Sequence, residues 1–363
     1  MNNYKNIIFD TFSCDVWHTL KNTGNPILIY GMGNGADKII SVFEKYGIEY
    51  SDVFASDGFV RGHSYRGKRV LSYTEACEKY GAFDIVVSFG SRLPDVMEKI
   101  YSLEQSHTVY APDVPVCEGE IFTEEFFDKH AQQLFSAREL FYDQRSRLIF
   151  DDIVRFKLTG KLSYLRLTEC NENEADKCLN FEKYRIYVDL GAYNGDTVKK
   201  YSALCPNLER IYAFEPDKRN FKKLSAYCEE LTDVTTALFN CAAYSYDTTL
   251  EFSASGNRNS SAASQGSFRH KTVEIEAKAL DSVCKSADFV KYDVEGMEYE
   301  ALLGSGLLIA SSSPDLLVSM YHKSEDLYKL PIILKGLNPR YKLYLRRLPY
   351  IPAWDLNMYA VTD

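Results

Sequence analysis

The sequence predicts an α/β protein with two doubly wound parallel sheets, a smaller one near the N-terminus and a larger one near the C-terminus. Apolar runs with strand spacing alternate with helical patterns over residues 25–112. Residues 124–158 are charged and aromatic at helical spacing. The alternation restarts near residue 184, and such alternation is typical of parallel βαβ units. The length of 363 residues suits more than one domain. We expect an N-terminal domain at 1–117, a helical linker at 118–183 and a C-terminal domain at 184–363.

The first part of the chain opens with an apolar and aromatic segment, to about residue 20, for which we expect a helix. Residues 27–30 read as a strand that turns through glycines into an amphipathic helix. Two more strands are expected in DVFASD at residues 52–57 and in FDIVVSFG at residues 83–90. Strands joined through helices in this way indicate a parallel sheet.

The last part of the chain contains a second series of strand candidates. Those expected to run parallel are residues 185–192, 210–216, 235–243, 289–296 and 316–322. Alternating segments predict an antiparallel ribbon from residues 249–255 and 272–280. A closing hairpin is expected from residues 341–348 and 357–361. The whole of this part is therefore predicted to be one doubly wound sheet with an antiparallel finish.

The composition disfavours some classes of function. A net charge of -9 and a pI of about 5.4 argue against a nucleic-acid partner, because binding phosphates needs clustered Lys and Arg. No apolar run reaches the length of a membrane span, so we expect no membrane-spanning segment. The nine cysteines are dispersed without CxxC spacing, and the start of the chain lacks the order of a secretion signal. We therefore expect a cytoplasmic protein.

The stretch YVDLGAYNGDT, residues 187–197, connects a predicted strand to a predicted helix. Gly191 would let a ligand approach the backbone, although a plain turn would also use a glycine here. Glu215 ends the next strand, where an acid is placed to accept both hydroxyls of a ribose. Asp189 suits a cation or an amine, and Asp196 would repel a pyrophosphate. A ligand with a ribose, a positive centre and no phosphate fits S-adenosylmethionine (SAM) better than NAD or ATP.

Four segments of the C-terminal half carry a family resemblance. They are YVDLGAYNGDT, FEPD, NCAAY at residues 240–244 and KYDVEGMEYEALLG at residues 291–304. Together they resemble the FkbM family of SAM-dependent methyltransferases over roughly residues 184–360. The most specific segment is DVEGMEYE, which has the order D-x-E-G-x-E of the family. The resemblance implies a class I methyltransferase sheet and methyl transfer, usually to a hydroxyl of a sugar, polyketide or similar small or glycan substrate.

The same resemblance implies a set of cofactor-binding residues. The methionine part of SAM would lie against Asp189, Gly191, Ala192, Tyr193, Asn194 and Thr197. The residues implied for the ribose and the adenine are Glu215 with Pro216, then Asn240, Cys241 and Ala242, and Asp293 completes the pocket.

Three polar residues at the ends of neighbouring strands, Asp293, Glu295 and His322, are catalytic candidates for methyl transfer. The reaction needs alignment and a group that takes the proton of an alcohol. His322 is the candidate general base, because its unperturbed pKa of about 6.5 suits proton transfer near neutrality. The same three side chains could instead hold a divalent cation that lowers the pKa of the alcohol. Metal dependence stays open, as do structural roles such as Asp293 capping the next helix.

A second glycine-rich loop, YGMGNGA at residues 30–36, fits G-x-G-x-x-G/A, with Asp57 at the end of the next strand. It resembles the small Rossmann-like modules attached to nucleotide-sugar-modifying enzymes. We expect a Rossmann-like module that binds a nucleotide or nucleotide sugar, or that is only structural. Two alternatives to a methyltransferase follow. One is an NAD-dependent oxidoreductase or epimerase of nucleotide sugars that uses this loop, and the other is a SAM-binding protein without turnover.

The acceptor is predicted only as a class, a small molecule or glycan with a hydroxyl group. Asn259, Ser260 and Ser261, in a loop rich in Gly, Ser and Asn, are candidates for contacts with acceptor hydroxyls. Arg346 is a candidate for binding a phosphate or carboxylate of the acceptor, or it pairs with an acid and has no role in binding. The aromatic helices between the two sheets are a candidate homodimer surface, and the oligomeric state stays open.

Overall fold

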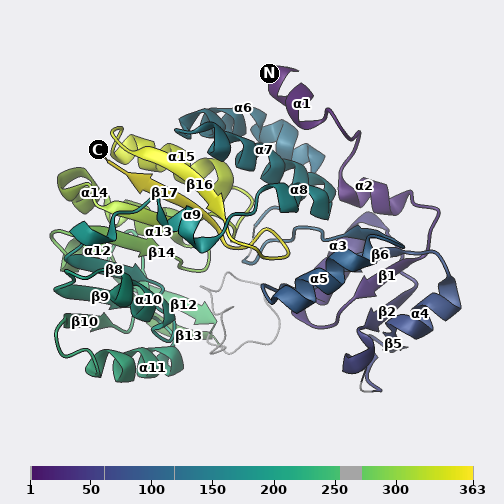
Figure 1. Ribbon diagram of the computed structural model, residues 1–363, viewed down its shortest axis with the longest axis horizontal. Helices are drawn as coiled ribbons and strands as arrows, with labels where there is room; N and C mark the ends of the chain where they lie inside the picture. Colours follow the sequence, from purple (N-terminus) through teal and green to yellow (C-terminus); the bar gives the residue numbers. More distant parts are fainter. Residues whose placement is uncertain (1, 61, 118, 254–271, 363) are drawn as a thin grey trace.

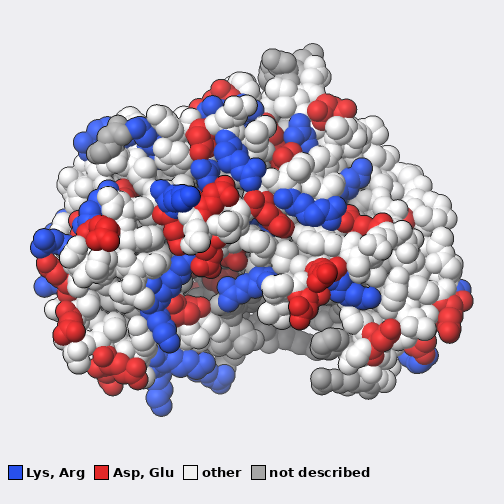
Figure 2. Space-filling view, viewed as in Figure 1, with Lys and Arg blue, Asp and Glu red and all other residues white. Residues whose placement is uncertain are grey.

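The computed structural model describes residues 2–60, 62–117, 119–253 and 272–362. They form two α/β units joined by a layer of helices (Figure 1). Figure 2 shows the surface hollowed between the two units, with acidic and basic side chains intermixed on this face of the molecule. The predicted α/β class is confirmed, with one sheet in each unit.

The N-terminal unit is a five-stranded parallel sheet in the order β5-β2-β1-β6-β7. Its strands are β1 (Ile27–Tyr30), β2 (Asp52–Ala55), β5 (Leu71–Ser72), β6 (Asp84–Val87) and β7 (Thr108–Tyr110). Every residue of β1, β2 and β6 is buried, as expected for a parallel sheet covered on both faces. The other elements are α1 (Asn2–Ile8), α2 (Val16–Lys21), α3 (Asn34–Tyr46), η1 (Asp57–Phe59), β3 (Ser64–Tyr65), β4 (Lys68–Arg69), α4 (Tyr73–Tyr80) and α5 (Pro94–Leu103).

The first twenty residues form two short helices instead of the single helix expected from the sequence. The helix α1 ends at Ile8, and α2 begins at Val16. Asp15 caps α2 by accepting a hydrogen bond from the backbone N–H of His18, and its other carboxylate oxygen accepts one from Glu124 N. A side chain that satisfies the free N–H groups of a helix end favours a new start there.

The C-terminal unit is a seven-stranded sheet in the order β10-β9-β8-β14-β15-β17-β16. The first five strands run parallel, and β17 lies antiparallel between β15 and β16, which includes the predicted closing hairpin. The strand order reverses between β8 and β14, and ligands of open α/β sheets bind at such a switch point. The strands are β8 (Ile186–Leu190), β9 (Arg210–Phe214), β10 (Thr235–Phe239), β14 (Phe289–Tyr292), β15 (Asp315–Ser319), β16 (Lys342–Arg347) and β17 (Leu356–Val361).

The helices of this unit connect its strands in sequence. They are α10 (Asp196–Leu204), α11 (Lys218–Glu229), α12 (Leu280–Val283), α13 (Glu298–Leu303), α14 (Gly306–Ser312) and α15 (Asp326–Leu337). A separate small sheet contains the predicted ribbon, in which β12 pairs antiparallel with β13. Its strands are β11 (Ala242–Ala243), β12 (Thr248–Ser253) and β13 (Thr272–Lys278).

Helices occupy the segment between the two sheets. They are α6 (Glu124–Leu140), α7 (Gln144–Thr159), α8 (Leu162–Leu167), α9 (Glu172–Asp176) and η2 (Phe181–Lys183). The helix α6 packs on α15, and α7 packs on β16, so this layer lies against the C-terminal sheet. One hydrophobic core cluster contains buried residues of both units and of these helices, among them Ile85, Phe150 and Val290. The division at residues 117 and 183 stays a prediction. None of the described helices combines the length and apolar character needed to cross a membrane.

Candidate active site

A cavity of about 290 Å³ lies at the carboxyl ends of β8, β9 and β14, where the C-terminal unit meets the N-terminal unit. Among its lining residues are these cofactor-binding candidates: Gly191, Tyr193, Thr197, Glu215, Pro216, Cys241, Ala242 and Asp293. Glu295, a predicted catalytic residue, also lines it. The topology explains this grouping, because the carboxyl ends of neighbouring parallel strands meet at one edge of the sheet.

Gly191 brings two loops of the site into direct contact. Its φ is 89°, in the left-handed region that glycine adopts without strain. A Cβ atom at this position would lie 1.9 Å from the backbone oxygen of Asp293. The backbone after β8 therefore touches the backbone after β14, and glycine is required for this approach. The two loops form one continuous wall of the cavity.

Glu215 is the acid expected to bind a ribose, and its side chain is fixed inside the cavity wall. Its Oε2 accepts a hydrogen bond of 2.9 Å from Tyr193 N, and its Oε1 accepts one of 2.8 Å from Asp217 N. Burial raises the pKa of Glu215 to about 7. The carboxylate is thus held by the backbone at the edge of the cavity, with lone pairs left for donors on a ligand.

The raised pKa gives a prediction for SAM affinity. Ribose hydroxyls donate to the ionised carboxylate, so we expect affinity to be full above pH 7 and to fall as the pH drops through 7. A carboxyl with a pKa of about 7 is roughly tenfold less ionised at pH 6 than at pH 8, so the Kd for SAM should rise by up to about tenfold. Isothermal titration calorimetry across this range measures it.

Glu215→Gln is the control for this pH effect. This variant should bind SAM more weakly at every pH. The part of the pH dependence of the Kd that comes from Glu215 should be lost, whereas the part that comes from ionisable groups of SAM itself should remain. An equal pH dependence in the variant and the wild type would contradict the prediction.

Besides Asp189, three predicted cofactor residues do not line the cavity: Ala192, Asn194 and Asn240. The side-chain amide of Asn240 donates to the backbone oxygens of Glu215 (2.8 Å) and Pro216 (3.1 Å). Asn194 accepts a hydrogen bond within its own loop. Ala192 is completely buried. These residues shape the loops that face the cavity.

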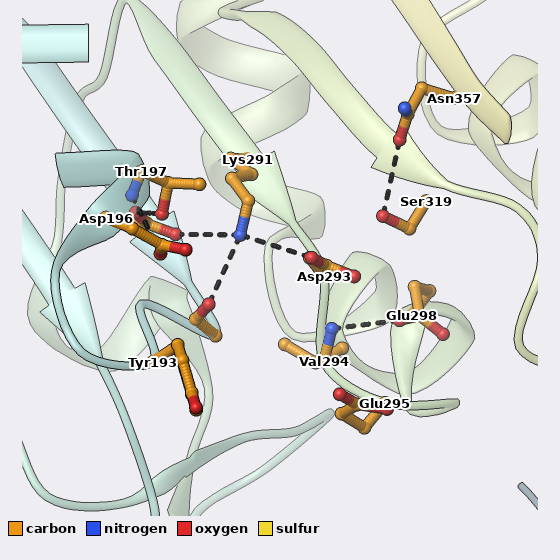
Figure 3. A network of polar contacts seen from close by, with 12 residues as sticks. Tyr193, Asp196, Thr197, Lys291, Asp293, Val294, Glu295, Glu298, Ser319 and Asn357 are labelled. Atoms are coloured by element: carbon orange, nitrogen blue, oxygen red, sulfur yellow. Dashed lines mark hydrogen bonds and ion pairs between the residues drawn. The ribbon is translucent and has the colours of Figure 1, made fainter. Parts of the chain in front are cut away.

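A buried lysine connects the two acidic strand ends (Figure 3). Lys291 Nζ lies 3.2 Å from Asp189 Oδ1 and 3.6 Å from Asp293 Oδ2, and it donates to the backbone oxygen of Gly191 at 3.2 Å. The hydroxyl of Thr197 donates to the other oxygen of Asp189. Burial opposes the charge of Lys291, but Asp189 and then Asp293 outweigh it, so the lysine's pKa is raised. Asp189 has no exposed surface and does not line the cavity, so it acts on the site through Lys291 and Thr197.

Asp293, Glu295, Glu298 and His322 form a cluster at the ends of β14 and β15. The Nε2 atom of His322 lies 3.4 Å from Glu295 Oε2 and 3.7 Å from Asp293 Oδ1. Its Nδ1 atom lies 2.9 Å from Glu298 Oε1. Asp293 and Glu295 line the cavity, whereas His322 and Glu298 are completely buried behind them. The structure therefore brings the three predicted catalytic residues together but presents only the two carboxylates to a ligand.

The electrostatic setting of His322 differs from the one assumed in the sequence analysis. Burial disfavours its charged form, but the carboxylates of Glu298 and Glu295 outweigh burial and raise its pKa well above the ordinary value. The premise that its pKa stays near 6.5 is therefore wrong for this structure. The sequence could not show this, because the burial and the Glu298 contact depend on the packing of α13 against the end of β15.

A second cavity of about 290 Å³ lies in the N-terminal unit, at the carboxyl ends of β1, β6 and β7. The glycine-rich loop and the start of α3 line it through Met32, Gly35 and Lys38. Val116 and Trp354 line both this cavity and the first one. The two cavities are therefore adjacent, on either side of the contact between the units.

The acid of the dinucleotide fingerprint is engaged elsewhere. Asp57 accepts hydrogen bonds from the backbone N–H of Thr74 (3.2 Å) and from its hydroxyl (3.1 Å), and these lie at the start of α4. Asp57 does not line the second cavity. Asp57 is therefore not placed to bind the ribose of NAD in this cavity, as the oxidoreductase alternative would require.

A comparison with protein families identifies the C-terminal unit. The model of the methyltransferase FkbM domain matches residues 189–343. The chain carries an FkbM methyltransferase domain. The match spans Glu215 and the DVEGMEYE segment, so the resemblance seen in the sequence is confirmed. The enzyme class is a SAM-dependent methyltransferase.

Solved structures extend the comparison to the whole chain. Methyltransferase FkbM from Methylobacillus flagellatus KT matches with a TM-score of 0.70 at 17% identity, over 99% of this chain and 98% of that one. It shows that the fold of both units is shared. An rRNA methylase from Streptococcus thermophilus (TM-score 0.33, 16% identity, 53% of this chain and 93% of that one) is more distant. Fibrillarin from Aeropyrum pernix with bound SAM is also more distant (TM-score 0.30, 15% identity, 50% of this chain and 69% of that one). The comparison with curated proteins gave no match.

The residues of the FkbM domain fit SAM. Glu215 offers a carboxylate for two hydroxyls, and Cys241 and Ala242 give the cavity a small, largely apolar border next to it. Gly191, whose Cβ would strike backbone, leaves the loop without a side chain at this point. Asp196 is an exposed acid at the rim, which suits a positively charged ligand better than a pyrophosphate.

Several cavity residues were missed by the sequence analysis, notably Lys291, Tyr321, Trp354 and Arg92. Lys291 left a usable signal, because a lone charge in the apolar strand FVKY needs a buried partner. Trp354 and Arg92 lie in loops far apart in the sequence, and both line the cavity because the two units are in contact. A Cβ on Gly90 would strike the ring of Trp354, which shows how close this contact is.

Arg346 lies away from the cavity, and Asn259, Ser260 and Ser261 fall outside the described residues. The guanidinium of Arg346 is buried, and it donates to Asp143 (2.7 Å), to Ser146 Oγ (3.0 Å) and to its neighbour's backbone oxygen. These contacts tie β16 to the start of α7. The geometry supports the hypothesis that Arg346 pairs with an acid, and it does not support the hypothesis that Arg346 binds the acceptor.

We expect Arg346→Ala to lower the free energy of unfolding by about 2 kcal/mol, because hydrogen bonds to a buried charge are lost. The Kd for SAM and the KM for an acceptor should stay within about twofold. Arg92→Ala is the contrasting variant, since Arg92 is exposed and lines the cavity. Urea denaturation and steady-state kinetics measure the two effects. A change in acceptor KM without a loss of stability in Arg346→Ala would contradict the structural role.

Proposed function

We propose that the protein is a SAM-dependent O-methyltransferase that acts on a hydroxyl of a sugar, a glycan precursor or a related small metabolite. The observation that carries this proposal is the pair of adjoining cavities, which share Val116 and Trp354. The first cavity suits SAM and the reacting hydroxyl. The second gives room for the rest of an acceptor that is longer than a single small group. The FkbM domain supplies the chemistry, and the N-terminal unit would supply part of the acceptor site.

The proposed acceptor class is favoured by the polar and aromatic groups near the shared lining. Arg92 is exposed at the first cavity, and Phe89 and Trp354 line the second. Aromatic surfaces and an arginine suit a sugar ring or a base that bears an anionic group. Nucleotide sugars contain a sugar ring, a base and anionic groups. This acceptor class agrees with the module that the glycine-rich loop resembles.

The reaction we propose is a direct displacement on the methyl group of SAM. SAM supplies an activated methyl group on a sulfonium. The acceptor oxygen forms a bond to that methyl carbon, the carbon–sulfur bond breaks, and its electron pair stays on sulfur. We assign the acceptor proton to Glu295, whose carboxylate faces the cavity beside that of Asp293. His322, which has no exposed surface, is then a positioning residue that acts through these two carboxylates.

The experiment is methyl transfer from radiolabelled SAM to a panel of nucleotide sugars, free sugars and cell-extract glycans. We expect labelled product with a hydroxyl-bearing acceptor. Glu295→Gln should lower kcat by about 100-fold or more, since positioned proton transfer contributes at least that much. The control Glu98→Gln, an exposed acid on α5 outside the cavity, should leave kcat unchanged.

Two outcomes would overturn the proposal. Binding of SAM without labelled product from any acceptor class would favour a SAM-binding protein without turnover. Thermal stabilisation by NAD and none by SAM would favour the oxidoreductase alternative.

We also propose a reducing cytoplasmic location and a homodimer. All nine cysteines are free thiols, which supports the location. Tyr142, Leu148 and Leu167 are exposed apolar side chains on or beside α7 and α8, which supports a contact surface there. Light scattering of the purified protein tests the dimer, and a monomer at micromolar concentration would contradict it.

A further inference from the structure

We propose that Asp293, Glu298 and His322 bind one divalent transition-metal cation beside the cavity, next to Glu295. The binding site stands on its own geometry, and only its part in catalysis rests on the proposed function. The three side chains come from two neighbouring segments, the loop into α13 and the end of β15.

The spacing of the ligand atoms suits a single cation. One ligand atom from each of Asp293, Glu298 and His322 lies within 4.8 Å of the other two. The Nε2 atom of His322 lies 3.7 Å from Asp293 Oδ1 and 3.4 Å from Glu295 Oε2. Ligands held at about 2.1 Å from one ion lie roughly 3–4 Å from each other. Glu298 Oε1 lies nearest the other ring nitrogen, Nδ1, at 2.9 Å, so the Glu298 carboxylate or the imidazole has to rotate to bring all three ligands onto one cation.

Unpartnered buried atoms point to a missing ligand. Neither ring nitrogen of His322 has a hydrogen bond of acceptable geometry among the described residues, and neither does Glu298 Oε2. Both residues are completely buried. Buried polar atoms without partners are rare in folded proteins, and an ion is one of the standard explanations. The 2.9 Å approach of His322 Nδ1 to Glu298 Oε1 is short enough for attraction but is not aligned as a hydrogen bond.

The charges around His322 favour a cation. Asp326 is also buried and faces the same cluster, where its Oδ2 accepts a hydrogen bond from Lys323 N. Four carboxylates therefore surround one imidazole. The buried ammonium of Lys291 contacts Asp293, but it also neutralises Asp189.

The ligand types narrow the choice of metal. One imidazole nitrogen with several carboxylate oxygens suits Mn²⁺, Fe²⁺ or Zn²⁺ better than Ca²⁺, which prefers oxygen ligands alone. Asp293 and Glu295 also line the cavity, so the cation would lie where it could polarise an acceptor hydroxyl.

A protonated His322 held by carboxylates is the competing explanation, and metal binding without SAM or acceptor separates the two. The full-length protein is treated with EDTA, freed of chelator and titrated with MnCl₂, while electron paramagnetic resonance measures free Mn²⁺. Parallel melting curves use MnCl₂, ZnCl₂ and MgCl₂. We expect one Mn²⁺ per chain and a higher melting temperature. Asp293→Asn and His322→Gln should each weaken binding at least tenfold.

The control is His130→Gln, which changes another histidine with an unpartnered ring nitrogen outside the cluster. It should bind Mn²⁺ like the wild type. If wild-type protein binds none of the three metals, or if Asp293→Asn binds Mn²⁺ as tightly as the wild type, the metal site is overturned. The wild-type result is decisive even if His322→Gln fails to fold. Methyl transfer without metal binding would overturn the site alone, whereas metal binding without methyl transfer would leave the site and overturn the proposed function.

Discussion

Lys291→Met should lower the free energy of unfolding by about 3–5 kcal/mol, because it leaves a buried carboxylate without its cation. Asp189 has no exposed surface, and Lys291 is its only cationic partner among the described residues. The hydroxyl of Thr197 still donates to Asp189 but does not neutralise it. Denaturation with urea at pH 7.5 measures the loss. We also expect weaker SAM binding, because the loop after β8 is anchored through these contacts.

The double variant Asp189→Asn with Lys291→Met is the control for this interpretation. Removing both charges should recover most of the stability lost in Lys291→Met, since the cost comes from the unpaired charge and not from the lost side-chain volume. SAM affinity should stay low, because the carboxylate that orders Thr197 is gone. If the double variant is as unstable as the sum of its single variants, the two residues do not act as a pair.

The sequence predicted the parts of the fold that local patterns determine. Buried parallel strands read as continuous apolar runs, and this identified β1, β6, β8 and β9 near their observed bounds. Antiparallel segments alternate in polarity, so the ribbon of β12 with β13 and the closing hairpin were also predictable. The break between α1 and α2 was missed, because the cap at Asp15 outweighs an apolar pattern that continues across it.

The candidate site was predictable where the strand end itself places a residue. Gly191, Glu215 and Asp293 follow strands directly, Glu295 comes two residues after Asp293, and all four line the cavity. Burial of a polar side chain depends instead on distant packing. The sequence could not show that α7 encloses Arg346, because its partners Asp143 and Ser146 lie about two hundred residues earlier.

Local sequence patterns also could not predict how the N-terminal unit contributes to the lining of the cavities. Trp354 reaches both cavities because the backbone of Ser91 pairs with that of Ile351, which brings the loop between β16 and β17 onto the end of β6. That contact joins residues about 260 positions apart, and neither segment has a motif of its own. Such long-range contacts, which complete the lining of both cavities, follow from the fold and not from the residues that form them.

Gly191→Ala is expected to abolish detectable SAM binding and to cost at least about 3 kcal/mol of the free energy of unfolding. The new Cβ would lie 1.9 Å from the backbone oxygen of Asp293, and backbone cannot rotate away as a side chain can. The strands β8 and β14 would have to separate at their ends. The left-handed φ of 89° adds strain of its own. Calorimetric titration with SAM and thermal melting measure the two effects.

Gly195→Ala separates conformational strain from this overlap. Gly195 has the same φ of 89°, but its Cβ would meet only side-chain and backbone atoms of α11 at 3.4 Å or more. We therefore expect a loss of about 1 kcal/mol, the usual cost of a left-handed alanine, with SAM binding retained. Equal losses in the two variants would mean that φ alone governs this loop. The contact between Gly191 and Asp293 would then have no special part in holding the cofactor site together.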